Sequence, residues 1–212
     1  GAPVNLGPAI NTKGDERDPF RFGDRFYFTS NGHVGFGGLD IYRVVKMPDG
    51  TWSKPLNLGP VINSEFDEDA PFIHPDNRTL YFSSKAHNNM GGYDIFKSVQ
   101  NDEGLWSAPE NIGYPINTVD DDIYFVLSVN GKSGFYSSNL PNGYGGQDIY
   151  EIKFPAEEFD LVVLKADVVM PGTKPGEQSA KATFIDEQTN KIQGIYKTNR
   201  STGKFVSIVP SG

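Results

Sequence analysis

Cysteine is absent from the 212-residue chain, and histidine occurs only at His33, His74 and His87. The first absence excludes a disulfide framework and a thiol nucleophile. The scattered histidines do not form a metal motif of the H-E-x-x-H type, and the sequence has no P-loop, no G-x-G-x-x-G motif and no G-x-S-x-G elbow. We therefore expect no catalytic residues, no metal and no cofactor, and we predict that the chain is not an enzyme.

Long apolar runs are also missing. No run approaches the roughly 20 residues of a membrane-spanning helix, so no direct membrane span is expected. The first residues lack the basic and apolar regions of a signal peptide, and we expect a mature or excised chain. Basic residues are outnumbered, and the net charge of −8 argues against nucleic acid as a partner.

A repeat dominates what the sequence does contain. The stretch GGLDIY at 37–42 returns as GGYDIF at 91–96 and as GGQDIY at 145–150, and the aspartates of successive copies are 54 residues apart. Aromatic residues make up 13% of the chain, which suits strands better than helices. A period of this length indicates a repeat architecture.

The middle copy shows how one repeat is expected to fold. Four short stretches have strand character, at 69–75, 79–84, 93–100 and 105–113, and turn-forming clusters separate them. Pro109 places the last stretch at a sheet edge, because proline cannot donate to a strand ladder. Four antiparallel strands per repeat are typical of a β-propeller blade. We predict an all-β fold with three four-stranded blades, belonging to a six-bladed propeller.

The Gly-Gly-x-Asp motif is predicted to be structural. Its glycines end a loop where a Cβ would clash, and the two apolar residues after the aspartate are expected to pack between blades. The aspartate is expected to accept hydrogen bonds from hydroxyls at the facing strand end. The motif residues are Gly37, Gly38, Asp40, Gly91, Gly92, Asp94, Gly145, Gly146 and Asp148, and the expected donors are Thr29, Ser30, Ser83, Ser84, Ser137 and Ser138.

These motifs resemble a known family. The stretch DEDAPFIHPDNRTLYFSSKAHNNMGGYDIF at 67–96 is similar to TolB-like, WD-type propeller repeats. The combination of GG-x-DIY with W-S-x-P-x-N-L-G, seen at 52–59, resembles repeats of OmpA-family envelope proteins of Bacteroidota. The resemblance covers residues 3–154, although the third copy lacks prolines at the positions of Pro71 and Pro75. It implies a periplasmic, outer-membrane-associated protein.

Repetition ends near residue 154, so we expect a domain boundary there. Residues 155–160 are predicted to be a linker between a propeller part, 1–154, and a second domain, 161–212. The stretch TNRSTGKFVSIVPSG at 198–212 resembles the signature of carboxypeptidase-regulatory-like domains. That resemblance implies a partial, truncated β-sandwich, whose strands are expected at 182–186, 193–198 and 204–209, after a β-rich run from 161.

Acidic residues precede the first strand of every repeat. Equivalent positions of a propeller lie on one rim, where clustered carboxylates focus negative potential. These acids either cap turns and solvate the rim, or dock a basic partner segment, or bind a cation. The candidate partner-binding residues are Asp15, Glu16, Asp67, Glu68, Asp121 and Asp122.

Two classes of function follow. The first is a non-enzymatic protein-binding scaffold of the bacterial cell envelope, which docks an envelope protein or peptide on its rim. The alternative is a carbohydrate- or peptide-binding accessory module, in which Phe36, Tyr93 and Tyr144 stack on a sugar. Exposed rings lying side by side would favour the sugar, and rings packed between blades would oppose it.

The ends of the repeat array are unequal. The stretch PVNLGPAINT at 3–12 matches an outer strand and its following turn, with no earlier strands before it. The third repeat ends without the W-S-x-P stretch that supplies this strand in the other two. Closed propellers have about 4–8 blades. The chain is therefore expected to be either a fragment of a longer protein or one half of a homodimer in which two half-rings complete each other.

Overall fold

The computed structural model describes residues 1–154, 161–168, 172, 180–188, 190, 192–198 and 204–210. The predicted linker at 155–160 lies outside these residues. Every regular element in the described residues is a β-strand, and none of these residues forms a helix that could cross a membrane. The all-β prediction is confirmed.

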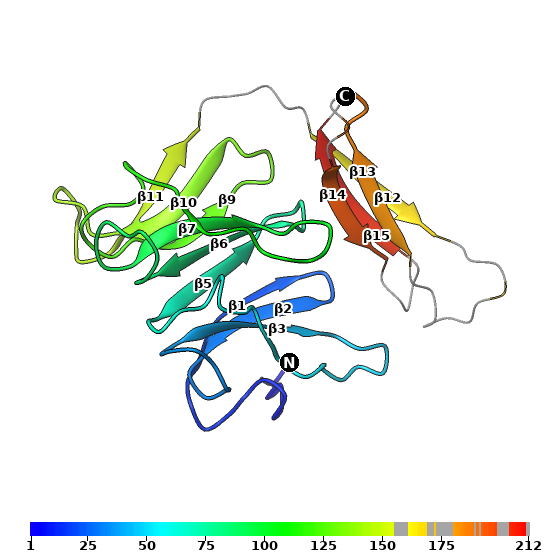
Figure 1. Ribbon diagram of the computed structural model, residues 1–212, viewed down its shortest axis with the longest axis horizontal. Helices are drawn as coiled ribbons and strands as arrows, with labels where there is room; N and C mark the ends of the chain where they lie inside the picture. The colour runs from blue at the N-terminus through cyan, green and yellow to red at the C-terminus, as the bar shows by residue number, and fades with distance from the viewer. Residues whose placement is uncertain are drawn as a thin grey trace.

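Three antiparallel sheets follow one another along the chain (Figure 1). The first is β1-β2-β3-β4, with β1 Glu16–Phe22, β2 Arg25–Ser30, β3 Asp40–Val45 and β4 Leu56–Asn57. The second is β5-β6-β7-β8, with β5 Glu68–Ile73, β6 Thr79–Ser84, β7 Asp94–Val99 and β8 Glu110–Asn111. The third is β11-β10-β9, with β9 Ile123–Leu127, β10 Ser133–Ser138 and β11 Asp148–Lys153. We name these sheets blade 1, blade 2 and blade 3.

The outer strand of a blade is shorter than predicted. A strand was expected over 105–113, but only Glu110 and Asn111 pair continuously with β7, and Trp106 makes a single bridge to Gln100. Pro109 explains the gap, since it has no N–H to donate. Blade 3 has three strands and not the four predicted for each blade, because it lacks the W-S-x-P stretch that supplies the outer strand in the other two, and residues 1–12 form no strand.

The inner strand of each blade carries a β-bulge at the same position. The pairing register shifts between Arg17 and Phe20 in blade 1, and between Asp69 and Phe72 in blade 2. The residues inside the bulges, Asp18, Ala70 and Tyr124, have positive φ angles of 49°, 48° and 61°. Non-glycine residues rarely adopt this conformation. Its recurrence in three blades marks it as a feature of the repeat, even where blade 3 lacks the prolines.

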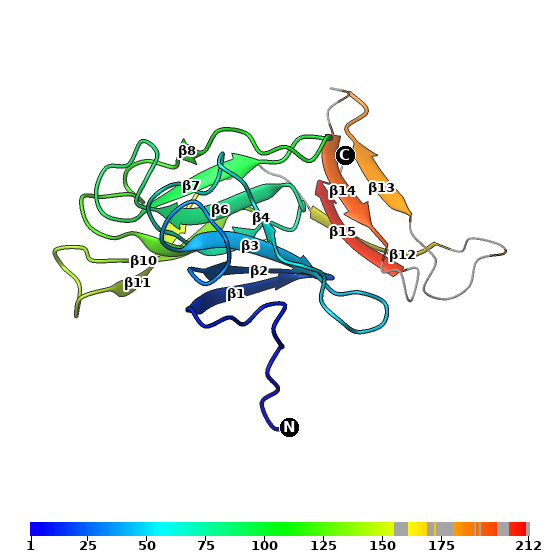
Figure 2. The same cartoon turned by 60° about the horizontal axis from the view of Figure 1, so that its bottom comes forward.

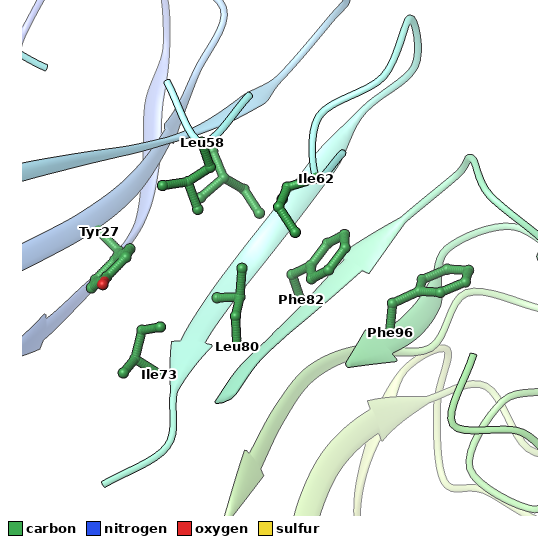
Figure 3. Packing of buried hydrophobic residues seen from close by; sticks show 8 residues of the cluster. Tyr27, Leu58, Ile62, Ile73, Leu80, Phe82 and Phe96 are labelled. Carbon is green, nitrogen blue, oxygen red and sulfur yellow. The ribbon is translucent and has the colours of Figure 1, made fainter. Parts of the chain in front are cut away.

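The hydrophobic core lies between successive blades. Figure 3 shows the larger cluster, in which Tyr27 of blade 1 lies toward Ile73 and Leu80 of blade 2, and Phe82 and Phe96 extend the cluster away from it. Ile62, from the turn that leads into blade 2, fills the space beside them. A second cluster joins blades 2 and 3 in the same way, through Ile95, Ile116, Phe125 and Tyr136. These faces confirm, for Ile41 and Ile95, the prediction that apolar residues after the motif aspartate pack between blades, whereas their equivalent Ile149 in blade 3 is exposed.

The C-terminal strands form two ribbons, which the first two figures show as β12–β15. Strand β12 (Leu161–Asp167) pairs with β15 (Lys204–Pro210), and β13 (Lys181–Ile185) pairs with β14 (Ile192–Lys197). The strands begin and end within two residues of the predicted bounds. The assignment of this part to a carboxypeptidase-regulatory-like sandwich stays a prediction.

Equivalent isoleucines in blades 1 and 3 test the inter-blade core. Ile41 is fully buried, whereas Ile149 is 83% exposed. Replacing Ile41 with Ala should lower the free energy of unfolding by about 2–5 kcal/mol, because it leaves a cavity. Replacing Ile149 with Ala should change it by less than about 0.5 kcal/mol. Denaturant titration measures both values, and equal effects would contradict this packing.

Candidate functional site

The glycine pair of each motif is a contact point for the next blade. A Cβ on Gly37 would lie 2.4 Å from the backbone carbon of Glu65, and one on Gly91 would lie 2.4 Å from that of Val119. Neither glycine has a positive φ angle. The predicted clash at these glycines is therefore confirmed, but its source is the backbone of the following blade and not the turn itself.

Each blade is attached to the preceding one by a segment that we call the lead-in segment, residues 56–67 for blade 2 and 110–121 for blade 3. Asn63 accepts a hydrogen bond from the N–H of Ile41 at 2.8 Å and donates one to its carbonyl at 3.0 Å. Asn117 makes the same two bonds to Ile95, both at 2.8 Å. One asparagine amide thus replaces a strand partner at each junction.

The motif aspartates accept hydrogen bonds, but their predicted donors are wrong. Asp40 Oδ2 accepts hydrogen bonds from Phe36 N at 2.6 Å and from Asn57 Nδ2 at 3.0 Å. Asp94 accepts the equivalent bonds from Met90 N and Asn111 Nδ2. Asp148 accepts bonds from Tyr144 N and Gly145 N. The aspartate therefore ties its own loop to the outer strand and makes no bond to the serines and threonines of the facing strand end.

Two of those hydroxyls, on Ser30 and Ser84, instead bond the second acid of the acidic cluster in their own blade. Ser30 Oγ donates to Glu16 and Ser84 Oγ donates to Glu68. The carboxylates also accept bonds from the residue four positions earlier, which is Thr12 for Glu16 and Ser64 for Glu68. Asp122 makes the same contacts with Thr118.

Glu68 and Asp122 are fully buried, so these two predicted rim residues face inward and are not available to a partner on the open surface. Burial raises the pKa of Glu68 to about 7, against the opposing effect of its bonds to Ser64 and Ser84. Burial also raises the pKa of Asp122. The less buried Glu16 differs: burial raises its pKa, but the bonds from Thr12 and Ser30 together outweigh this and hold it below the usual value.

The first acid of each cluster reaches the preceding blade. Asp67 Oδ1 accepts a hydrogen bond from Leu39 N at 3.0 Å, and Asp121 accepts one from Tyr93 N at 2.9 Å. Asp67 also forms an ion pair with Lys85 at 2.8 Å. Asp15, the exposed equivalent in blade 1, contacts Arg17 of its own blade. Whether these three acids bind a partner stays a prediction.

A cavity of about 240 Å³ lies between the inner strands of the three blades, and we call it the axial pocket. Its walls are mainly aromatic and apolar, and the bulged residues form part of its lining. The lining residues are Asp18, Pro19, Phe20, Ala70, Pro71, Phe72, Tyr124, Phe125 and Val126.

Two carboxyl groups meet beside this pocket. Asp18 Oδ2 is buried, and Asp69 Oδ1 accepts a hydrogen bond from Thr29 Oγ1 at 3.0 Å. Burial raises the pKa of Asp69, and the neighbouring Asp18 carboxyl raises it further by hydrogen bonding and charge. The pKa of Tyr124 is raised by burial and by the same two carboxyls. Because the acids share a site, they favour binding a proton or another positive group.

Sequence analysis missed Asp18 and Asp69 as a pair, although both lie in the acidic clusters. The available signal was a difference between repeats: Arg17, Asp69 and Ile123 are equivalent, as are Asp18, Ala70 and Tyr124. Positions that are equivalent in the repeats but carry different kinds of side chain do not serve the structural role that the repeats share. Comparing the copies for differences, as well as for matches, would have indicated the axial pocket.

The three proposed sugar-stacking rings do not form a platform. Phe36 and Tyr144 are exposed, but Tyr93 is half-buried at the junction of blades 2 and 3, with Lys85 Nζ 4.5 Å from its ring centre. No ring contact joins any two of them within the described residues.

The histidines have structural contacts. His33 and His87 bond the carbonyls of Ile10 and Ile62 and pack on aromatic rings. Across the described residues, no group of three or more acidic, histidine or cysteine side chains is arranged to hold a metal.

Removing Asp94 tests the loop-to-strand tie. Asp94→Ala should lower the free energy of unfolding by about 1–3 kcal/mol, since it leaves Met90 N and Asn111 Nδ2 without their acceptor. Asp148→Ala is the matched control, and should cost less because Asp148 accepts no outer-strand asparagine in the described residues. Thermal and denaturant unfolding measure the difference, and an Asp94→Ala protein as stable as the wild type would refute the assignment.

The raised pKa of Glu68 predicts a dependence of stability on pH. The folded state holds its proton more tightly than the unfolded state does, so this stabilisation is complete below pH 4.5 and is lost as pH rises through about 7. The free energy of unfolding of the wild type should therefore fall between pH 5 and 8. Glu68→Gln should reduce this fall by at most about 3 kcal/mol.

Glu16→Gln is the control for this measurement. Because the pKa of Glu16 is lowered, its contribution to stability is present above about pH 4.5 and is lost only as the solution becomes more acidic. It should leave the slope between pH 5 and 8 unchanged. Equal slopes for the wild type and Glu68→Gln would show that Glu68 does not carry the effect.

No protein-family model matches the chain, and no curated protein matches it. Among solved structures, the chain is similar to one assigned as TolB from Agrobacterium tumefaciens, with 15% sequence identity and a TM-score of 0.37. The match covers 90% of this chain and 56% of the other, so the chain spans little more than half of that structure's length.

Proposed function

We propose that the chain is a non-enzymatic protein-binding scaffold of the bacterial cell envelope, and that the axial pocket seats a basic side chain of a partner protein or peptide. The observation that carries this proposal is the Asp18–Asp69 pair beside an aromatic-walled pocket. Lysine and arginine satisfy both features, because their charge pairs with carboxylates and their stems and cations pack on aromatic rings.

The size of the pocket supports a side chain as its occupant. About 240 Å³ is less than the roughly 300–1,000 Å³ of typical small-molecule sites. The closeness of the two carboxyls also favours binding over glycoside hydrolysis. The Asp18 carboxyl lies near enough to raise the pKa of Asp69 directly, whereas glycosidase pairs stand roughly 5–9.5 Å apart to accommodate the sugar or a water.

The envelope setting rests on the repeat motifs. Their resemblance to OmpA-family repeats supports a periplasmic location and membership of an outer-membrane-associated assembly. The sugar-binding alternative has weaker support, since Tyr93 is engaged at a blade junction and does not share a face with Phe36 and Tyr144 as an aromatic platform would.

The proposal is tested with short peptides that differ only in one central residue, Lys, Arg or Gln. The Lys and Arg peptides should bind more tightly than the Gln peptide, and salt should weaken them because exposed charges are screened beyond roughly 8 Å at physiological ionic strength. Asp18→Asn should reduce this preference by about tenfold or more, the effect of losing one charge-assisted bond.

The variant and its control suit the fold. Asparagine tolerates the positive φ of residue 18 well, so Asp18→Asn should fold normally. Asp120→Asn removes the same charge from an exposed loop position and should not alter binding. Affinity that is equal for all three peptides, or unchanged in Asp18→Asn, would rule out the axial pocket as the binding site.

A further inference from the structure

Blade 3 exposes the face that blades 1 and 2 use to hold the next blade. Ile149 is 83% exposed, whereas its equivalents Ile41 and Ile95 are fully buried. Phe135 on the same face is 41% exposed, and its equivalent Tyr27 is fully buried. The apolar character of this face matches a buried surface and not a solvent-facing one.

The glycine contact point of blade 3 is also free. Among the described residues, a Cβ on Gly145 or Gly146 would meet no atom within 4 Å, in contrast to the backbone that crowds Gly37 and Gly91. Asp148 accepts no outer-strand asparagine, although Asp40 and Asp94 each do. Blade 3 therefore presents a complete junction face with its contacts unused, and we call it the open socket.

The N-terminal residues 4–15 are equivalent to the lead-in segments, and they already have the same internal structure. Gly7 N donates to Asn5 Oδ1 at 2.8 Å, as Gly59 N does to Asn57. Asn11 Nδ2 donates to Asn5 Oδ1 at 2.9 Å, as Asn63 does to Asn57 at 2.8 Å.

The segment is held in place from its own blade. Ile10 is buried against Phe28 and Tyr42, and Thr12 is bonded to Glu16. Its docking side is nevertheless unused within the described residues: Leu6 is 41% exposed, whereas its equivalent Leu58 is 8% exposed, and Asn11 bonds no strand of another blade. A preformed lead-in segment and an unused socket thus occur in one chain.

We propose that residues 4–15 of a second copy of this chain dock in the open socket. Asn11 of that copy would bond the backbone of Ile149, as Asn63 bonds Ile41. Asn5 would donate to Asp148 and Asp15 would accept from Gln147 N, as their equivalents do at the junctions already formed. The proposal concerns a surface apart from the axial pocket and does not rest on the proposed function.

Two copies can satisfy each other completely. In a two-fold dimer the interface is isologous, because the lead-in segment of each copy meets the socket of the other. Two copies, each with the three described blades, together have six blades, and closed propellers have about 4–8. Ring closure would use both sockets and both lead-in segments.

The experiment measures the mass of the chain in solution by light scattering across a range of concentrations. The wild type should form a dimer. Gly145→Val should be monomeric, because its side chain occupies the space that the second copy's backbone at Lys13 needs, while the empty surroundings of Gly145 leave its own fold unchanged. Asn11→Ala, which impairs the lead-in segment, should also be monomeric or at least tenfold weaker in dimerisation.

Mixing the two variants tests whether each supplies the part of the junction that the other lacks. Gly145→Val retains an intact lead-in segment and Asn11→Ala retains an intact socket, so the mixture should form a heterodimer with one working junction. Leu105→Ser, a control at an exposed turn of blade 2, should dimerise like the wild type. A monomeric wild type, a dimer that survives Gly145→Val, or a mixture that remains monomeric would each overturn the proposal.

Discussion

The pair of hydrogen bonds between an asparagine amide and the backbone of an isoleucine is the interaction on which the blade array depends. Asn63 and Asn117 each occupy both polar groups of one residue in the preceding blade. These hydrogen bonds fix the position of the lead-in segment along the face of the preceding blade. The neighbouring apolar residue, Ile62 or Ile116, is then buried, and the chain beyond it passes close enough to exclude any side chain at the glycine pair.

The carboxylates complete the junction from both sides. Asp40 and Asp94 hold the outer strand to the glycine loop, while Asp67 and Asp121 cap the backbone after that loop. Glu68 and Asp122 close the lead-in segment against its own blade. Burial raises the pKa of Glu68 and Asp122, so these two residues also make the stability of the junction sensitive to pH.

Sequence periodicity was sufficient to predict the blades. The repeated motif gave the number of repeats and the strand positions to within a few residues. It did not give the partners of Asp40, because a serine at the facing strand end and an asparagine 17 residues later are equally consistent with the repeat. Only the chain path shows that the glycines of one blade lie against the backbone of the next.

The axial pocket was less predictable for a related reason. Periodicity emphasises positions that are the same in every copy, and those positions maintain the fold. Asp18, Asp69 and Tyr124 come together because the three bulges lie around one space, and the side chains at equivalent bulge positions differ between the copies. Their chemistry is set by the differences between the copies, and no local motif in any single repeat contains all three.

The placement of the junctions has a consequence for cooperativity. The strand contacts between blades join β5 to blade 1 and β9 to blade 2, so each junction involves neighbours alone. The unfolding of such an array is described by one term for each blade and one for each junction, as in a one-dimensional lattice. Blade 2 has two junctions and blade 3 has one, so amide hydrogens in β11 should exchange through local fraying, and those in β6 only when the array opens.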